Sequence, residues 1–297
     1  MGLYRRFRTI FLLFGTFFLS QEVFSQGNTE VFLVNCTETL DGFTFENLRN
    51  LSQNAGYDNQ PYFLDNNTLL YARNHDGQTD VSVYDMSTGT EAFWNAPTEG
   101  GEYSPQPIPN NGDIAAVRLD PDGLQRLYRF SKNSKGEELI PNAVVAYFAF
   151  YDANTVVSSV IVNETLQLVV YDLKEKQSYK LLEGSGRAFQ KIPKSTSSVS
   201  YTALNEEKNY DVYQLDMEDL ESFFVVQLPI GVQDLVWYND SKILIGSGTQ
   251  LFVYDLFGDG NWQRVANFSK EGIKDITRLA VSPDGKTIAF VAEKNNP

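Results

Sequence analysis

Histidine and cysteine, which often serve as general base and nucleophile, each occur once in this chain. His75 is the one histidine among 297 residues, so a Ser-His-Asp triad would have to use it as general base. A serine hydrolase also needs a Gly-x-Ser-x-Gly turn, and neither 184–186 nor 246–248 has that spacing. His75 stands in the polar segment 74–80, where we expect a solvated loop. We therefore predict no catalytic residues and no enzymatic activity.

Metal ligands are limited to oxygen atoms for a similar reason. A single histidine and a single cysteine, Cys36, exclude a metal site rich in nitrogen or sulfur. Calcium needs only oxygens, and the segments 120–123 and 255–260 supply several aspartates. Neither follows the twelve-residue calcium loop, and turn formation explains the same residues. We predict no metal and no cofactor, and calcium binding stays open as the alternative.

The overall charge narrows the class of partner. The chain has 38 Asp and Glu against 24 Lys and Arg, for a net charge of −14. Nucleic acid is disfavoured, because neutralising phosphates needs a basic patch and the sequence shows none. The lone cysteine also excludes an intramolecular disulfide. Stability must therefore come from burial.

A repeated pattern supplies the elements that would position any functional group. An apolar run, a polar turn and a second apolar run recur six times, most plainly at 281–291. The first apolar residue after each turn is Leu69, Ile114, Val156, Val199, Ile243 or Ile288. The period is roughly 42 to 45 residues, which is typical of propeller blades with four strands each. Short β-branched and aromatic runs between turn residues favour strands throughout.

The last copy of the repeat holds only two strands before Pro297. The segments 29–35 and 43–51 have the pattern of a third and a fourth blade strand. We therefore predict an all-β fold, a six-bladed β-propeller with four-stranded blades, in which N-terminal strands close the last blade.

The first 25 residues have the features of a secretory signal. Three arginines, Arg5, Arg6 and Arg8, precede the apolar run 10–19, and Val23-Phe24-Ser25 is a plausible cleavage site. The run is too short to cross a bilayer of roughly 30 Å as a helix. We predict a signal peptide at 1–25, one β-propeller domain at 26–297, and a monomeric periplasmic or secreted protein without a membrane span after cleavage.

The turn of the last copy carries a family resemblance. Ser282-Pro283-Asp284-Gly285-Lys286, followed by Ile288-Ala289-Phe290, resembles the WD-like Ser-Pro-Asp-Gly repeat of the TolB-like six-bladed β-propellers. The segment 74–85 resembles the same family's link from second to third strand. The resemblance implies an exported, non-enzymatic scaffold that binds other envelope proteins through the loops at one end of the ring. The same repeat also occurs in propellers of prolyl-oligopeptidase-like enzymes, so it indicates fold more firmly than role.

In a propeller, the loops that lead into the innermost strands converge at one mouth of the channel. The candidate partner-binding residues in these loops are Asp58, Glu102, Tyr103, Tyr147, Arg187, Asp234 and Asp275. Such acidic and aromatic groups suit a partner's loop, a basic peptide or a cation. The competing interpretation is that Asp58 and Asp275 cap turns and that the tyrosines pack between blades.

Three classes of function follow from these residues. We predict a scaffold that binds an envelope or extracellular protein, because the repeat is present and a catalytic constellation is not. One alternative is a propeller that binds a small ligand or a sugar. The other is a hydrolase- or lactonase-type propeller that uses channel carboxylates or a calcium ion, since paired carboxylates can cleave glycosides at the right separation.

Overall fold

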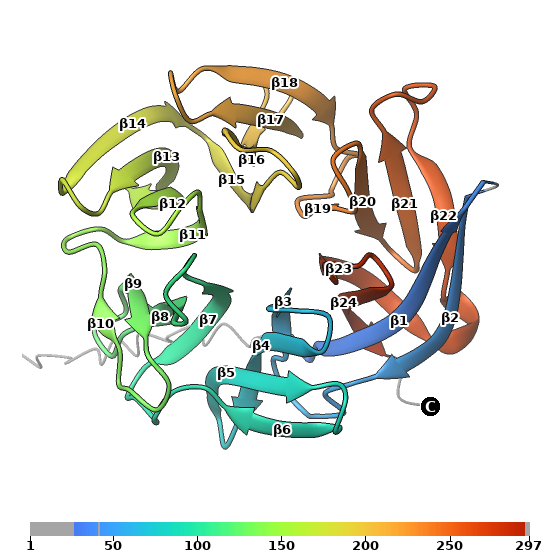
Figure 1. The fold of residues 1–297 in the computed structure, drawn as a ribbon, viewed down its shortest axis with the longest axis horizontal. Helices are drawn as coiled ribbons and strands as arrows, with labels where there is room; N and C mark the ends of the chain where they lie inside the picture. The colour runs from blue at the N-terminus through green and yellow to red at the C-terminus, as the bar shows by residue number, and fades with distance from the viewer. Residues whose placement is uncertain (1–26, 41, 295–297) are drawn as a thin grey trace, which may run out of the picture.

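Strands make up nearly all of the regular structure. The computed structural model describes residues 27–40 and 42–294. In these residues twenty-four strands form six four-stranded antiparallel sheets, which stand as blades around a central axis (Figure 1). One 3₁₀ turn, η1 (Ser269–Glu271), accompanies them in the same residues. The predicted six-bladed β-propeller is confirmed.

Each blade runs from an innermost strand at the channel to an outermost strand at the rim. Blade 1 consists of β3 (Asn59–Phe63), β4 (Thr68–His75), β5 (Gln78–Asp85) and β6 (Thr90–Phe93). Blade 2 consists of β7 (Gly101–Pro107), β8 (Ile114–Leu119), β9 (Gln125–Phe130) and β10 (Glu137–Glu138). Blade 3 consists of β11 (Val145–Phe150), β12 (Thr155–Val162), β13 (Thr165–Asp172) and β14 (Gln177–Glu183).

The other three blades have the same order of strands. Blade 4 consists of β15 (Ser185–Lys191), β16 (Ser198–Leu204), β17 (Tyr210–Asp216) and β18 (Ser222–Gln227). Blade 5 consists of β19 (Val236–Trp237), β20 (Lys242–Ser247), β21 (Gln250–Asp255) and β22 (Gln263–Asn267). Blade 6 consists of β23 (Ile273–Val281), β24 (Thr287–Lys294), β1 (Glu30–Thr39) and β2 (Gly42–Asn50).

The second strand of each blade forms the core. The apolar residues that follow the repeated turns are all at most 1% exposed: Leu69, Ile114, Val156, Val199, Ile243 and Ile288. Both faces of a second strand pack against neighbouring blades, which explains its continuous apolar sequence. One core cluster, for example, joins Leu244 and Leu251 of blade 5 to Phe290 of blade 6.

Blade 6 combines two segments that are far apart in the sequence. β1 pairs antiparallel with β24 from Glu30 opposite Ala292 to Asn35 opposite Thr287, and β2 pairs with β1 on the outside. In Figure 1 the blue strands lie directly beside the red ones. The predicted closure of the last blade by N-terminal strands is confirmed.

The repeated turn of blade 6 is held by its own side chains. The Ser282 hydroxyl donates to Asp284 at 2.7 Å and accepts the backbone N–H of Thr287 at 2.9 Å. Gly285 has a φ of 71°, a left-handed value that glycine adopts without strain. The Asp284 N–H donates to Asn66 in the corresponding turn of blade 1 at 3.0 Å. This turn therefore also links the closing blade to its neighbour.

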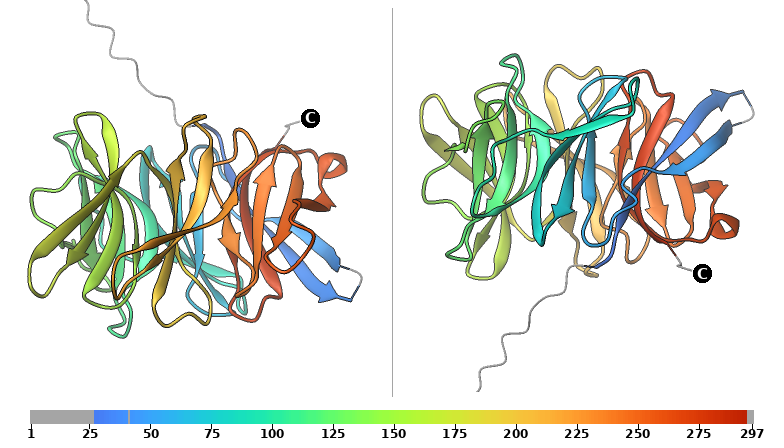
Figure 2. Two further views of the ribbon diagram at one scale, coloured as in Figure 1. Left: turned by 90° about the horizontal axis from the view of Figure 1, so that it is seen from above. Right: turned by 90° about the horizontal axis from the view of Figure 1, so that it is seen from below.

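Figure 2 shows the ring from the side, with the β1–β2 hairpin reaching out beyond the other strands of blade 6. No helix of the described residues is long and apolar enough to span a membrane. The predicted signal peptide at 1–25 lies outside the described residues.

Candidate functional site

The innermost strands are irregular where they face the channel. In β3, β7, β11, β15 and β23 the pairing register with the second strand shifts within the strand. Such a β-bulge leaves a residue without an opposite partner and re-aims its side chain. Gln60, Ser104, Arg187 and Arg278 lie in these bulges and line the channel cavity. The bulges therefore determine which side chains reach the cavity.

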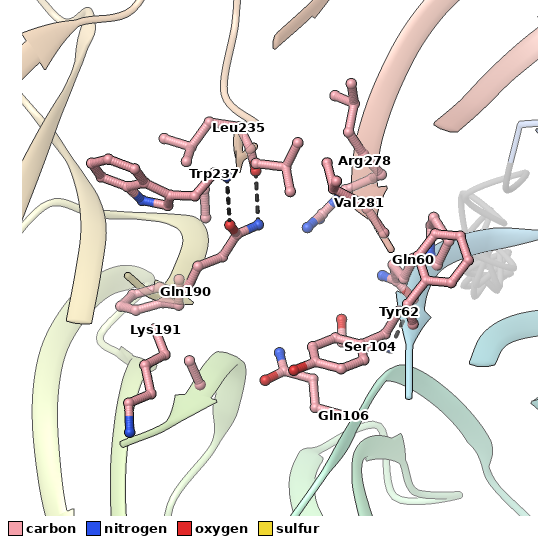
Figure 3. A pocket seen from close by; sticks show the side chains of 18 of the residues that line it. Gln60, Tyr62, Ser104, Gln106, Gln190, Lys191, Leu235, Trp237, Arg278 and Val281 are labelled. Atoms are coloured by element: carbon pink, nitrogen blue, oxygen red, sulfur yellow. Dashed lines mark hydrogen bonds between the residues drawn. The ribbon is translucent and has the colours of Figure 1, made fainter. Parts of the chain in front are cut away.

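Glutamine side chains bind the backbone groups that the irregular inner strands leave open. The Gln60 Oε1 accepts the Ser104 N–H at 2.8 Å, so blade 1 is tied to blade 2. Gln106 Nε2 donates to the Phe148 carbonyl at 2.8 Å, which ties blade 2 to blade 3. Gln190 of blade 4 makes both kinds of bond to blade 5, donating to the Leu235 carbonyl at 2.9 Å and accepting the Trp237 N–H at 3.1 Å (Figure 3).

Replacing Gln190 with leucine is expected to destabilise the ring. Both bonds to blade 5 would be lost, and each unsatisfied backbone group costs about 1–3 kcal/mol. We expect a fall in melting temperature of roughly 5 °C, measured by thermal unfolding. Gln263→Leu on the exposed face of β22 is the matched control and should leave the midpoint unchanged. Equal midpoints for Gln190→Leu and the wild type would show that this bidentate link is not stabilising.

Two arginines and one aspartate form an ionic cluster in the channel. Arg187 of β15 forms a bidentate ion pair with Asp234: its Nε donates to Oδ1 at 2.9 Å, and its Nη2 donates to Oδ2. Arg278 of β23 approaches the same carboxylate, with Nε 3.2 Å from Oδ1. The guanidinium of Arg278 also lies over the ring of Tyr147, 5.3 Å from its centroid. One carboxylate is thus shared by two cations.

Tyrosines surround this cluster. Tyr57 packs edge-on against Tyr103, with ring centroids 5.9 Å apart. Burial raises the pKa of Tyr57 to about 12, while the nearby charges of Arg278 and Arg187 act in the opposite direction. Tyr57 therefore stays a neutral hydrogen-bonding group beside the arginines at physiological pH.

The channel encloses a cavity of about 390 Å³. Inner strands or the loops before them line it from all six blades. Its charged lining side chains are Arg187, Lys191, Arg278 and Asp234. The cavity is therefore positive in a chain whose net charge is −14, whereas the sequence suggested an acidic mouth. The difference arises because Asp234 is neutralised by Arg187, and because Arg278 was not among the candidates.

The seven predicted site residues separate into two groups. Tyr147, Arg187 and Asp234 line the channel cavity, and Tyr103 packs against Tyr57 beside them. Asp58, Glu102 and Asp275 do not line the cavity. Their role in partner binding stays a prediction for the first group and has no geometric support for the second.

Asp58 and Asp275 lie in different surroundings, both away from the cavity lining. Asp58 is fully buried and accepts the Asn74 N–H at 2.9 Å and the Asn54 amide at 3.1 Å. Asp275, by contrast, is exposed on β23 and has a left-handed φ of 49°. The contacts of Asp58 are thus structural, since they join β4 and Asn54 to the segment before β3.

Glu102 is buried between blades 1 and 2. It accepts a hydrogen bond from the Thr98 hydroxyl. Burial raises the pKa of Glu102 to about 8; the Thr98 bond lowers it, and the neighbouring Asp80 carboxyl raises it. Asp80 is in turn held by Gln78 at 3.0 Å. Two carboxyl groups side by side favour one protonated member.

The other chemical candidates lie away from the cavity. His75 ends β4, exposed, with its ring 5.4 Å from that of Phe93. Asp120 is bound by Arg118 and Arg126, and Asp122 by Arg126 at 2.7 Å. These carboxylates therefore already have cationic partners. In residues 27–40 and 42–294 no group of three or more His, Cys, Asp or Glu side chains could hold a metal ion.

The comparisons with known proteins point to one architecture. No protein-family model and no curated protein sequence matches the chain. Among solved structures it is similar to a putative TolB from Agrobacterium tumefaciens, with a TM-score of 0.65 and 11% identity over 91% of this chain and 99% of that one. TolB from Acinetobacter baumannii matches with a TM-score of 0.56 and 10% identity over 92% and 65%. An oligogalacturonate lyase in complex with manganese matches with a TM-score of 0.55 and 14% sequence identity. This match covers 86% of this chain and 84% of that one.

At these identities the likeness defines the fold. The chain has the fold of a six-bladed β-propeller, similar to the TolB structures.

Proposed function

We propose that this chain is an exported, non-enzymatic β-propeller that binds another protein of the cell envelope at the mouth of its channel. The observation that carries the proposal is the cluster of Arg187, Arg278 and three tyrosines beside an open cavity of about 390 Å³. Tyrosine and arginine are the side chains most enriched at binding hot spots. The signal-like segment at 1–25 and the fold shared with TolB support export.

The geometry of the cluster also suits binding better than catalysis. Asp234 is engaged by two guanidinium groups, so it is poorly placed to act as a general base. The lone histidine is outside the cavity lining. What the channel presents is a set of planar, hydrogen-bonding side chains held by bulged strands.

Tyr147→Ala tests the proposal. Tyr147 lines the cavity and supports Arg278, and the loss of a hot-spot residue costs about 2 kcal/mol or more. We expect the tagged full-length Tyr147→Ala variant to retain at least about tenfold less of the specific partner than the wild type does. The amount captured from an envelope extract is measured by quantitative mass spectrometry.

Tyr179→Ala is the matched control, since Tyr179 is exposed on the outer strand β14 and its hydroxyl donates to nearby Gln177 at 2.7 Å. It should capture the partner as well as the wild type. Unchanged capture by a folded Tyr147→Ala chain would refute binding at the channel.

A second candidate is the binding of a small acidic sugar. The positive cavity favours it, and one structure of similar fold is an oligogalacturonate lyase. Thermal stabilisation of the wild type by oligogalacturonate, with no protein captured, would favour this candidate over the scaffold.

A further inference from the structure

Arg278 is placed in the channel by a specific backbone irregularity. The register between β23 and β24 shifts between Thr277 and Leu279, so Arg278 is the inserted residue and has no opposite partner on β24. Its φ of 38° is left-handed, a conformation that costs energy in an arginine. Figure 3 shows its side chain pointing into the cavity, between Gln190 and Gln60. The bulge therefore directs a cation into the space that a ligand would fill.

The Arg278 side chain is partly buried and forms an ion pair with Asp234. Only 17% of the Arg278 side chain is exposed. Its Nε lies 3.2 Å from the Asp234 oxygen that already accepts from Arg187. Arginine has five N–H donors in a rigid fork, so a guanidinium that faces a cavity can bind a further acceptor there. The terminal nitrogens of Arg278 are thus suited to an acceptor supplied from outside the chain.

The charges around this site select the chemistry of that acceptor. Arg187 and Arg278 share one carboxylate, and Lys191 lines the same cavity. A carboxylate matches a guanidinium fork in two parallel bonds. A large polyanion would be repelled by the acidic surface of a chain with net charge −14. The size of the cavity, about 390 Å³, suits one or two side chains of a partner protein.

We propose that the channel captures an Asp or Glu side-chain carboxylate of the partner protein on the Arg278 guanidinium beside Arg187. This inference rests on the proposed function and specifies the chemistry of the partner segment. The Arg278 guanidinium lies over the ring of Tyr147, 5.3 Å from its centroid, and both residues line the cavity. The partner is therefore an acidic segment rather than the basic peptide that an acidic mouth would attract.

The test measures binding of defined probes to the full chain by calorimetry at low salt. The probes are a capped hexapeptide with two glutamates, the same peptide with two glutamines, and free galacturonic acid. We expect the glutamate peptide to bind and the glutamine peptide to bind at least tenfold more weakly. Because a charge-assisted hydrogen bond contributes about 1.5–3 kcal/mol, Arg278→Gln should weaken the glutamate peptide by roughly 10- to 100-fold.

Arg129→Gln is the charge-matched control. Arg129 lies outside the cavity lining and pairs with Asp113 at 2.5 Å, so its loss changes the net charge equally without touching the channel. The affinity of the Arg129→Gln variant for the glutamate peptide should stay within about twofold of the wild-type affinity, because distant exposed charges are screened.

Three outcomes would overturn the inference: no binding of the glutamate peptide, equal binding by Arg278→Gln, or binding of galacturonic acid alone. If the glutamate peptide does not bind while capture of the partner protein still depends on Tyr147, the proposed function stands. Only the inference that the partner segment is acidic is then wrong. If the glutamate peptide does not bind and capture of the partner does not depend on Tyr147, the channel is not the binding site.

Discussion

Replacing Phe32 with alanine is expected to lower the melting temperature of the entire ring by roughly 10 °C. Phe32 lies on the closing strand β1, is 2% exposed, and stacks on Phe290 of β24 with ring centroids 5.6 Å apart. Phe290 in turn stacks on Phe268 at 5.4 Å. Removing a buried phenylalanine costs about 3–5 kcal/mol through lost burial and the cavity left behind. In a domain of this size each kcal/mol is worth roughly 2 °C or more.

The measurement is differential scanning calorimetry, with Leu40→Ala as the control. Leu40 follows the same strand but is fully exposed near the tip of the hairpin, so its loss should leave the midpoint unchanged. The essential result is one transition shifted as a whole. A variant in which blade 6 melts first, while the other blades keep the original midpoint, would contradict the view that closure stabilises the entire ring.

The second large effect concerns pH. Burial holds the pKa of Glu102 at about 8 in the folded chain, well above its ordinary value of 4.5. Between these values the folded state binds more protons than the unfolded state, so the free energy of unfolding falls as pH rises. The contribution of Glu102 is fully present below pH 4.5 and is lost as the pH passes through about 8. Glu102→Gln keeps a neutral group there at every pH.

We therefore expect Glu102→Gln to melt about 5 °C or more above the wild type at pH 8.5, and to differ little from it at pH 4.5, because one pKa unit corresponds to about 1.4 kcal/mol. Melting temperatures across this range give the answer. Glu99→Gln, on the exposed loop before β7, should follow the wild-type curve. A constant offset between Glu102→Gln and the wild type at all pH values would show that Glu102 does not titrate in this window.

The fold could be predicted from the sequence because its signal is repeated. Each copy of the turn places an apolar residue in the second strand, and all six of these residues are buried. The segment 29–35 could be assigned to the last blade since the repeat left two strands of that blade unaccounted for. Agreement among six copies makes each single assignment more secure than one strand pattern would be.

The site was predictable only in part because bulges are local events. A one-residue insertion reverses the side of the strand on which a side chain lies, and no residue pattern in 273–281 marks Arg278 as the inserted one. Glu102 is a second example. It stands next to Tyr103 in the sequence, where we expected the channel mouth, but its side chain is buried between two blades. A sequence gives the position along a strand but not the direction after a bulge.

The inter-blade glutamines left a signal that could have been found. Gln60, Gln106 and Gln190 stand nine, eight and nine residues before Leu69, Ile114 and Val199 respectively. Their recurrence at one place in the repeat indicates a shared task. Comparing polar residues, as well as turns, across the six copies would have identified it.

The composition of blade 6 also sets an order of events in folding. β1 is made early but its partner β24 ends at Lys294, so more than two hundred residues must be synthesised before the two strands can pair. Contacts of such long sequence separation are slow to form, since a large loop has to close first. Until then both edges remain open to other strands. Ring closure is thus the last step of folding and the stage at which an unfinished chain is most exposed to aggregation.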